Sequence, residues 1–249
     1  MGLLLSGRLS RLRLARRELG LLAAASALVT VNWLTYIWGV QNGHVVETSL
    51  GYFINPLVSV ALGVGFLGER LRRAQVIAIA LAAVAVGVLA VNHGRVPWIA
   101  LVLAFSFALY GLLKKVAGVD SVPALAVETA FVAPLAIGYL LLLRWQGVDT
   151  LFRLGWTHDA LLLGAGVATA VPLLCFGAAA NRVPLSTLGV LQYLAPSIQF
   201  VCGVALLGET MSPVRWAGFA LVWVALILFV VDGVQNARPL APVPRSQEP

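Results

Sequence analysis

The stretch Pro56-Leu-Val-Ser-Val-Ala-Leu-Gly63-Val-Gly-Phe-Leu67-Gly68-Glu69 returns later in the chain as Pro196-Ser-Ile-Gln-Phe-Val-Cys-Gly203-Val-Ala-Leu-Leu207-Gly208-Glu209. The shared Pro, Gly, Val, Leu, Gly and Glu positions recur at a constant offset of 140 residues. A repeat inside an apolar, helical chain is typical of pseudo-symmetric membrane proteins, and many transporters are built in this way. The repeat therefore predicts a duplicated membrane fold.

The composition places most of the chain in a bilayer. Hydrophobic residues make up 60% of the 249 residues and charged residues 11%, about half the charged fraction of a soluble domain. Cys175 and Cys202 both lie in apolar runs and suggest neither a metal site nor a disulfide framework, so we expect no metal and no cofactor. The net charge of +7 comes from basic residues at the edges of apolar segments, which argues against a nucleic-acid partner.

Membrane-spanning helices need about 20 apolar residues each. Eight segments meet this requirement and predict an all-α integral membrane protein. Residues 1–18 form a basic cytoplasmic segment in this interpretation, and residues 233–249, which hold four prolines, form a disordered cytoplasmic tail. The predicted spans are 19–41, 46–68, 74–92, 96–115, 123–143, 159–180, 186–208 and 213–231.

The distribution of basic residues predicts the orientation. With the amino terminus in the cytoplasm, thirteen Lys and Arg residues lie on the cytoplasmic side and four on the opposite side. The span 46–68 then runs inward and its repeat partner 186–208 runs outward, so the two copies form an inverted-topology repeat. The second copy, residues 96–231, has five helices, whereas the first, residues 19–92, has three. Two helices are therefore missing at the amino end of the first copy.

Several motifs resemble one known family. They are Asn32-Trp33 with Tyr36-Ile-Trp38, Asn42-Gly43-His44, Ser49-Leu-Gly-Tyr-Phe-Ile-Asn-Pro56 and Leu191-Gln-Tyr-Leu-Ala-Pro196. Together they resemble the RarD-type branch of EamA-domain proteins in the drug/metabolite transporter superfamily. The resemblance implies ten helices in two inverted five-helix halves, a bacterial inner-membrane location, and transport of small organic solutes. Without the first two of those helices, the chain reads as an incomplete version of that fold, through either a misassigned start codon or a truncated paralogue.

Polar side chains inside the spans are costly in a bilayer and predict either a solute cavity or contacts between helices. On a helix, residues at spacings of three, four, seven and eleven share one face, and four of the spans carry such polar stripes. We interpret them as the walls of a weakly polar cavity, with hydrogen bonding between helices as the alternative. The cavity candidates are Asn32, Tyr36, Tyr52, Asn55, Tyr110, Gln192 and Gln199.

A second set of residues predicts coupling or gating. Pro56 and Pro196 each release a backbone carbonyl and predict either hinges for alternating access or plain packing kinks. Glu69 and Glu209 follow a glycine at the end of a span. For Glu69, an ion pair with one of the arginines at 70, 72 and 73 competes with a contact in a gate. Glu128, the carboxylate well inside a span, either pairs with Lys114 or carries a coupling proton.

These patterns favour a secondary transporter or exporter of small metabolites or drugs that works by alternating access. We expect no enzymatic activity and no catalytic residues, and the chain contains no phosphate-binding Gly-x4-Gly-Lys motif for direct use of ATP. A membrane-embedded lipid-modifying enzyme and a non-transporting truncated membrane protein are the alternatives. The expected partners are the lipid bilayer and a small-molecule solute, with a homodimer left open.

Overall fold

The computed structural model describes residues 14–91, 97–198 and 213–235. These ranges are helical and contain no strand, which confirms the predicted all-α fold. The helices are α1 (Arg16–Gln41), α2 (Val45–Leu67), α3 (Arg73–Val91), α4 (Trp98–Ala117), α5 (Ser121–Trp145), α6 (Trp156–Arg182), α7 (Leu185–Leu191) and α9 (Pro213–Gln235).

Among the described residues, five helices are long and apolar enough to cross a membrane: α1, α2 from Glu47 onward, α4, α5 and α6. Helices α3 and α9 contribute shorter apolar stretches, Arg73–Val88 and Trp216–Asp232. A helix rises 1.5 Å per residue, so about 20 residues match the hydrocarbon core of a bilayer. The chain is therefore a multi-pass integral membrane protein, as its composition predicts.

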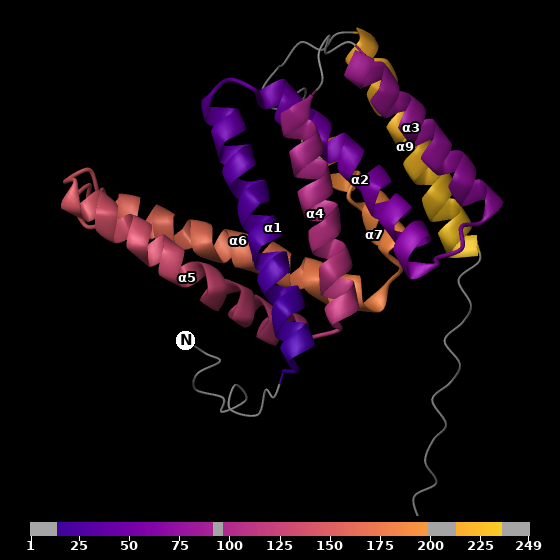
Figure 1. Cartoon of the computed structure of the whole chain (residues 1–249). Helices are drawn as coiled ribbons and strands as arrows, with labels where there is room; N and C mark the ends of the chain where they lie inside the picture. The colour runs from indigo at the N-terminus through magenta and orange to yellow at the C-terminus, as the bar shows by residue number, and fades with distance from the viewer. Residues whose placement is uncertain (1–13, 92–96, 199–212, 236–249) are drawn as a thin grey trace, which may run out of the picture.

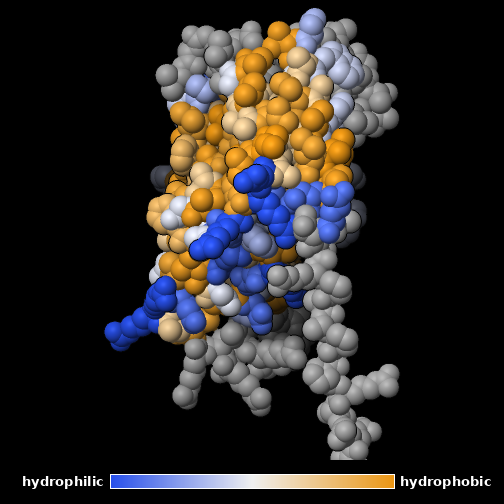
Figure 2. All heavy atoms as spheres, turned by 90° about the vertical axis from the view of Figure 1, so that its right-hand side faces the viewer, coloured by the Kyte–Doolittle hydropathy of each residue, from blue (hydrophilic) through white to orange (hydrophobic). Residues whose placement is uncertain are grey.

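The helices pack around α4, which lies against both α1 and α2 (Figure 1). Helix α2 also packs on α7, and α3 pairs with α9. Helices α5 and α6 form a long hairpin that extends away from the other helices, and most of its side chains are exposed. Figure 2 shows the face formed by α3 and α9, where a broad hydrophobic surface gives way to hydrophilic residues near the end at which α3 begins. A broad apolar surface of this kind suits contact with lipid.

The two copies of the repeat run in opposite directions. Helix α2 descends in Figure 1 while α7 ascends, and α3 ascends while α9 descends. Two elements of the first copy thus contact their own counterparts in the second, α2 against α7 and α3 against α9. The first described helix begins, and α9 ends, on the same side of the bundle. The antiparallel arrangement inferred from charge agrees with this geometry.

The predicted helix over 186–208 is wrong as a continuous element. Helix α7 ends at Leu191, a turn occupies residues 192–193, and helical structure resumes over residues 194–198. Pro196 has no N–H to donate to the carbonyl of Gln192, which instead accepts a hydrogen bond from Ala195 N at 3.2 Å. Helix α2, in contrast, continues through Pro56 without interruption. The two symmetric prolines therefore have different effects on their helices.

Two terminal boundaries also shift. Helix α1 begins at Arg16 rather than residue 19, because the Glu18 carboxylate accepts a hydrogen bond from Ala15 N at 2.8 Å and supports an earlier first turn. Helix α9 extends to Gln235, so residues 233–235 belong to a helix rather than to the predicted tail. Near that end, Asp232 accepts a hydrogen bond from Arg72 Nη1 at 3.4 Å, which joins α9 to the start of α3.

Candidate functional site

A buried ion pair lies between α4 and α5. Lys114 Nζ is 2.8 Å from Glu128 Oε1, and the two side chains are only 2% and 4% exposed. Tyr110, one turn before Lys114 on α4, donates a hydrogen bond to Glu128 Oε2 at 3.3 Å. Ser26 of α1 donates to the backbone carbonyl of Glu128 at 2.9 Å. Three helices thus meet at Glu128, and α4 supplies both partners of its carboxylate, as a buried charge requires. Of the alternatives left open by the sequence, the pair of Glu128 with Lys114 is present.

Aromatic rings and glycines hold this pair in place. The ring of Tyr110 stacks on Phe176 of α6 with centroids 5.8 Å apart. Close approach of α6 depends on Gly177, because a Cβ there would lie 3.1 Å from Lys114 Cε. Gly111 is equally constrained, since its Cβ would lie 3.2 Å from the ring of Phe176. Helix α6 therefore packs directly against the Lys114 side chain.

A second polar contact joins the two repeat copies directly. Asn55 Nδ2 of α2 donates a hydrogen bond to Gln192 Oε1, at the carboxyl end of α7. One residue further on, the Tyr193 hydroxyl donates to the Phe53 carbonyl at 3.1 Å. Two of the predicted cavity residues, far apart in the sequence, are thus brought into contact.

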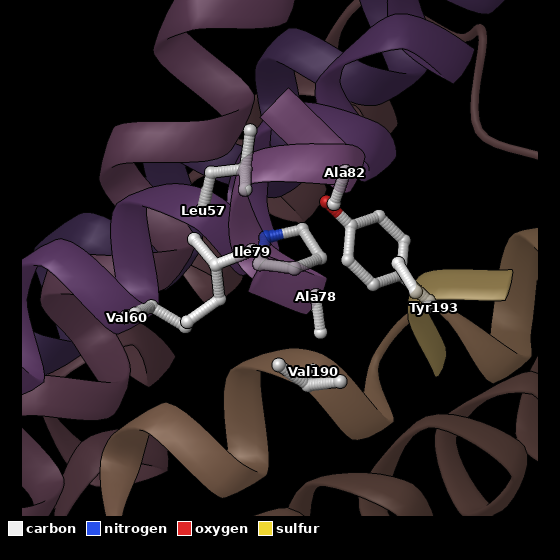
Figure 3. Close-up of a pocket in the computed structure, with 9 residues that line it drawn as sticks. Leu57, Val60, Ala78, Ile79, Ala82, Val190 and Tyr193 are labelled. Atoms are coloured by element: carbon white, nitrogen blue, oxygen red, sulfur yellow. The ribbon is translucent and has the colours of Figure 1, made fainter. Parts of the chain in front are cut away.

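The α2–α7 crossing is unusually close because of Gly189. A Cβ at this position would lie 2.8 Å from Ser59 Cβ and 2.9 Å from the carbonyl oxygen of Pro56. Small residues allow helix backbones to approach in this way inside membranes. Beside the crossing lies a small apolar cavity with room for about one water molecule, too small for a solute. Figure 3 shows the labelled residues around it, Leu57, Val60, Ala78, Ile79, Ala82, Val190 and Tyr193.

The remaining described cavity candidates form contacts between helices. Asn32 Nδ2 donates to the Leu103 carbonyl at 2.8 Å and to Ser106 Oγ at 2.9 Å, so it joins α1 to α4. The rings of Tyr36 and Tyr52 meet edge to face, with centroids 6.0 Å apart, across α1 and α2. Tyr52 remains 38% exposed. Gln199 and Glu209 lie outside the described residues.

The junction between α6 and α7 is held by charges from two other helices. The Glu69 carboxylate, just after α2, accepts hydrogen bonds from the backbone N–H groups of Leu185 at 2.6 Å and Ser186 at 2.8 Å. Lys115 Nζ of α4 donates to the carbonyls of Ala180, at 3.2 Å, and Val183. A carboxylate thus meets the start of one helix and an ammonium the end of another, which matches both helix dipoles. These contacts hold the connection between α6 and α7 against both α2 and α4.

Electrostatics at this junction favour the ionised carboxylate. Desolvation of Glu69 acts to raise its pKa, but hydrogen bonds from Ser186 and Leu185, with the charge of Lys115, outweigh it, and the pKa is lowered from 4.5. Gly63 provides the space, because a Cβ there would lie 2.7 Å from Glu69 Oε2. Among the described residues Glu69 forms no ion pair with the neighbouring arginines at 70, 72 and 73.

Sequence reasoning missed several participants. Nothing in the sequence separates Lys115 from Lys114, although they point to different helices. Ser26 is one of many small residues in α1. Tyr193 did carry a signal, because it stands at the repeat offset from Phe53, the residue it contacts.

Comparison with known proteins identifies the family. The sequence model of the EamA-like transporter family matches residues 2–91 and again residues 96–231. The chain belongs to this family.

Relatives within the EamA family place the chain in its RarD-type branch. It is 57% identical over 222 residues to a protein RarD of Streptomyces exfoliatus, covering 89% of this chain and 70% of that protein. An uncharacterized transporter of Vibrio cholerae is 45% identical over 219 residues, covering 88% of this chain and 72% of the relative. A solved crystal structure shares the fold with a TM-score of 0.55 and 18% identity, covering 92% of this chain and 93% of that chain. The chain is therefore a membrane protein of the drug/metabolite transporter superfamily, as the motifs predict.

Proposed function

We propose that this EamA protein is a secondary transporter that moves small organic solutes across a bacterial inner membrane by alternating access. The observation that carries the proposal is the direct contact of antiparallel repeat partners, α2 and α7, with a turn at residues 192–193 directly after α7. Interrupted helices at the interface of inverted repeats are where transporters commonly bind and move their solutes. Residues 19–92 and 96–231 act as the two repeat units in this proposal.

We place the solute-binding region beside the contacts of α2 with α1 and with α7. Tyr36 and Tyr52 form an aromatic wall, and Asn55 with Gln192 forms the polar floor. Aromatic faces stack on flat solutes and attract cations. The break at residues 192–193 allows the part of the chain after Gln192 to change its angle to α7 without breaking a regular helix. We assign the hinge to this break and to Pro196 rather than to Pro56.

The α6–α7 junction serves as the gate on the side where both ends of the described chain lie. Glu69 and Lys115 together connect α2 and α4 to this junction, so opening requires these charge-assisted hydrogen bonds to break. The same side carries the basic ends of helices, including Arg16, Arg73 and Arg182. Basic residues favour the cytoplasmic side of a membrane, so we assign this gate and both termini to the cytoplasm.

The ion pair of Lys114 and Glu128 is the proposed coupling site. An acid buried in a membrane span and paired with a base is a common proton-relay element. Protonation of the Glu128 carboxylate removes its charge and weakens its bonds to Lys114 Nζ and Tyr110. Because these bonds join α4 to α5, loss of the charge loosens the packing of both helices around α1.

Flux through vesicles tests the proposal. The purified chain is reconstituted into liposomes, an ion gradient is imposed, and uptake of a broad panel of labelled organic solutes is followed. We expect gradient-dependent uptake of at least one solute, and the absence of uptake for all of them would contradict the transport function. In the same vesicles Glu128→Gln should abolish uptake driven by a pH gradient. Full pH-driven uptake by the variant would exclude the proton role while leaving transport intact.

A further inference from the structure

Three buried polar atoms at the α2–α7 crossing have no hydrogen-bond partner within the described part of the chain. They are Asn55 Oδ1, Ser59 Oγ and Gln192 Nε2. Asn55 is 5% exposed and Ser59 is 1% exposed. Buried polar groups are nearly always hydrogen-bonded, so a cluster of partnerless atoms indicates a position that another molecule completes.

The three atoms lie along one line of contact. Asn55 and Gln192 are joined by a hydrogen bond between their amides. Ser59 is one turn beyond Asn55 on the same face of α2, and it lies against Gly189, one turn before Gln192. The two helices thus present their partnerless atoms to the same contact from opposite sides.

The chemistry of these atoms defines the group that completes them. After the amide–amide hydrogen bond is made, the oxygen of Asn55 remains as an acceptor group and the amino nitrogen of Gln192 as a donor group. Exchanging the oxygen and nitrogen of both amides reverses this bond but again leaves one acceptor and one donor. The hydroxyl of Ser59 can serve as either. A complementary group must therefore carry a donor and an acceptor side by side.

A charged group does not fit this arrangement. A carboxylate would face the acceptor of one amide, and an ammonium would face the donor of the other. The buried charges of the proposed coupling site, Lys114 and Glu128, are paired with each other on α4 and α5. A carboxamide offers an N–H and a C=O in one plane, which matches the paired amides. Tyr52 stands one turn before Asn55 on α2 and supplies an aromatic face for the rest of the molecule.

We propose that the Asn55–Ser59–Gln192 cluster binds the carboxamide group of an uncharged aromatic solute. The assignment rests on the proposed transport function, because it names the class of solute that the cavity takes. Sites built to hydrogen-bond a donor or acceptor reject analogues that lack it, since the buried protein groups then lose their partners. The cluster therefore acts as a selectivity element as well as a binding element.

The test compares four probes that share one ring. Benzamide carries the required donor and acceptor, acetophenone carries the acceptor alone, benzoate is an anion, and benzylamine is a cation. Binding to the purified protein in lipid nanodiscs is measured by ligand-observed NMR and calorimetry, with empty nanodiscs to subtract partition into lipid. We expect benzamide to bind about 10-fold more tightly than each of the others, because each of them leaves at least one buried polar atom of the cluster without a partner. Equal affinities for all four probes would overturn the assignment.

Variants locate the binding. Asn55→Leu combined with Gln192→Leu removes both amides at once, so neither is left without its partner, and it should abolish the preference for benzamide. Ser59→Ala leaves the amide pair intact and should weaken benzamide binding several-fold, which provides a second measurement if the double variant fails to fold. Asn181→Leu is the matched control, because it deletes an amide that donates to the Val119 carbonyl elsewhere, and it should bind like the wild type. An unchanged preference in the folded double variant, or unchanged binding in Ser59→Ala when the double variant does not fold, would place the site elsewhere.

The outcome is separable from that of the transport proposal. Selective benzamide binding without flux of any solute would contradict transport while keeping the site. Flux of solutes that lack a carboxamide, unchanged in Asn55→Leu/Gln192→Leu, would keep transport and overturn the site.

Discussion

Tyr193 and Phe53 stand 140 residues apart, at the offset of the internal repeat, and they contact each other across the two copies. The ring centroids are 6.4 Å apart, and the Tyr193 hydroxyl donates a hydrogen bond to the Phe53 carbonyl at 3.1 Å. Residues related by a two-fold axis meet each other only close to that axis. The pseudo-symmetry axis of the protein therefore passes between α2 and α7, at the helix break and the paired amides of Asn55 and Gln192.

Gly189→Ala should disrupt this crossing. The added Cβ meets Ser59 Cβ and a backbone carbonyl that cannot move without shifting α2. Overpacking of this kind costs about 1–3 kcal/mol, so the thermal unfolding temperature in detergent should fall. Gly87→Ala on α3 is the control, because no heavy atom lies within 4 Å of its added Cβ, and it should leave stability unchanged or slightly raised. Equal unfolding temperatures for Gly189→Ala and the wild type would contradict the close approach.

The sequence predicts the spans and their directions because both depend on local quantities, the hydropathy of about 20 residues and the charge at their ends. It also offers the pairing of Glu128 with Lys114 as an alternative, since both stand near the same connection between helices. The partners of the Glu69 carboxylate, in contrast, depend on the tertiary fold. Its carboxylate binds N–H groups 116 residues away, at a helix start whose position depends on the packing of α2 against α7. Hydropathy and spacing carry no information about that contact.

The turn directly after α7 illustrates a second limit of sequence-based prediction. Pro56 and Pro196 occupy equivalent positions in the repeat, and the local chemistry of proline is the same in both. Only the second is preceded by a turn, at residues 192–193. There the side chains of Gln192 and Tyr193 are engaged by α2, through Asn55 and the Phe53 carbonyl. Tertiary contacts, which a local pattern does not contain, coincide with this interruption.

The ion pair of Lys114 and Glu128 should show strong coupling in a double-mutant cycle. Lys114→Met or Glu128→Met alone leaves one buried charge without its partner, at a cost of about 3–5 kcal/mol. The double variant replaces both charges with apolar side chains and should recover most of the lost stability. Thermal unfolding of the four proteins in detergent measures the coupling.

A pair with an exposed arginine gives the comparison for that cycle. Arg153 Nη2 lies 2.9 Å from Asp149 Oδ1, and 53% of the arginine side chain but 10% of the aspartate side chain is exposed. A pair that opens to water in this way contributes about 0–1 kcal/mol. Arg153→Met should therefore have little effect. If Lys114→Met were equally mild, the buried pair would not hold α4 and α5 together.

Glu69 should make stability depend on pH in the acid range. Its pKa in the folded protein is lowered from 4.5, because the N–H groups of Leu185 and Ser186 and the charge of Lys115 outweigh the opposing effect of desolvation. A carboxyl group with a lowered pKa stabilises the fold at pH values above its unfolded pKa, and this contribution is lost as the pH falls through the folded pKa. Glu69→Gln keeps an acceptor oxygen but removes the charge from the start of α7. At neutral pH the variant should therefore be less stable by about 0.3–1 kcal/mol, the usual effect of a charge at a helix terminus.

The measurement is thermal unfolding of both proteins in detergent from about pH 7 to about pH 3. Comparison of the two curves removes the contributions of the other carboxylates. The gap between wild type and variant should stay constant at high pH, begin to narrow below about pH 4.5, and close as the pH falls through the lowered pKa of Glu69 in the folded protein. A gap that persists unchanged to the lowest pH would show that the charge of Glu69 does not hold the α6–α7 junction.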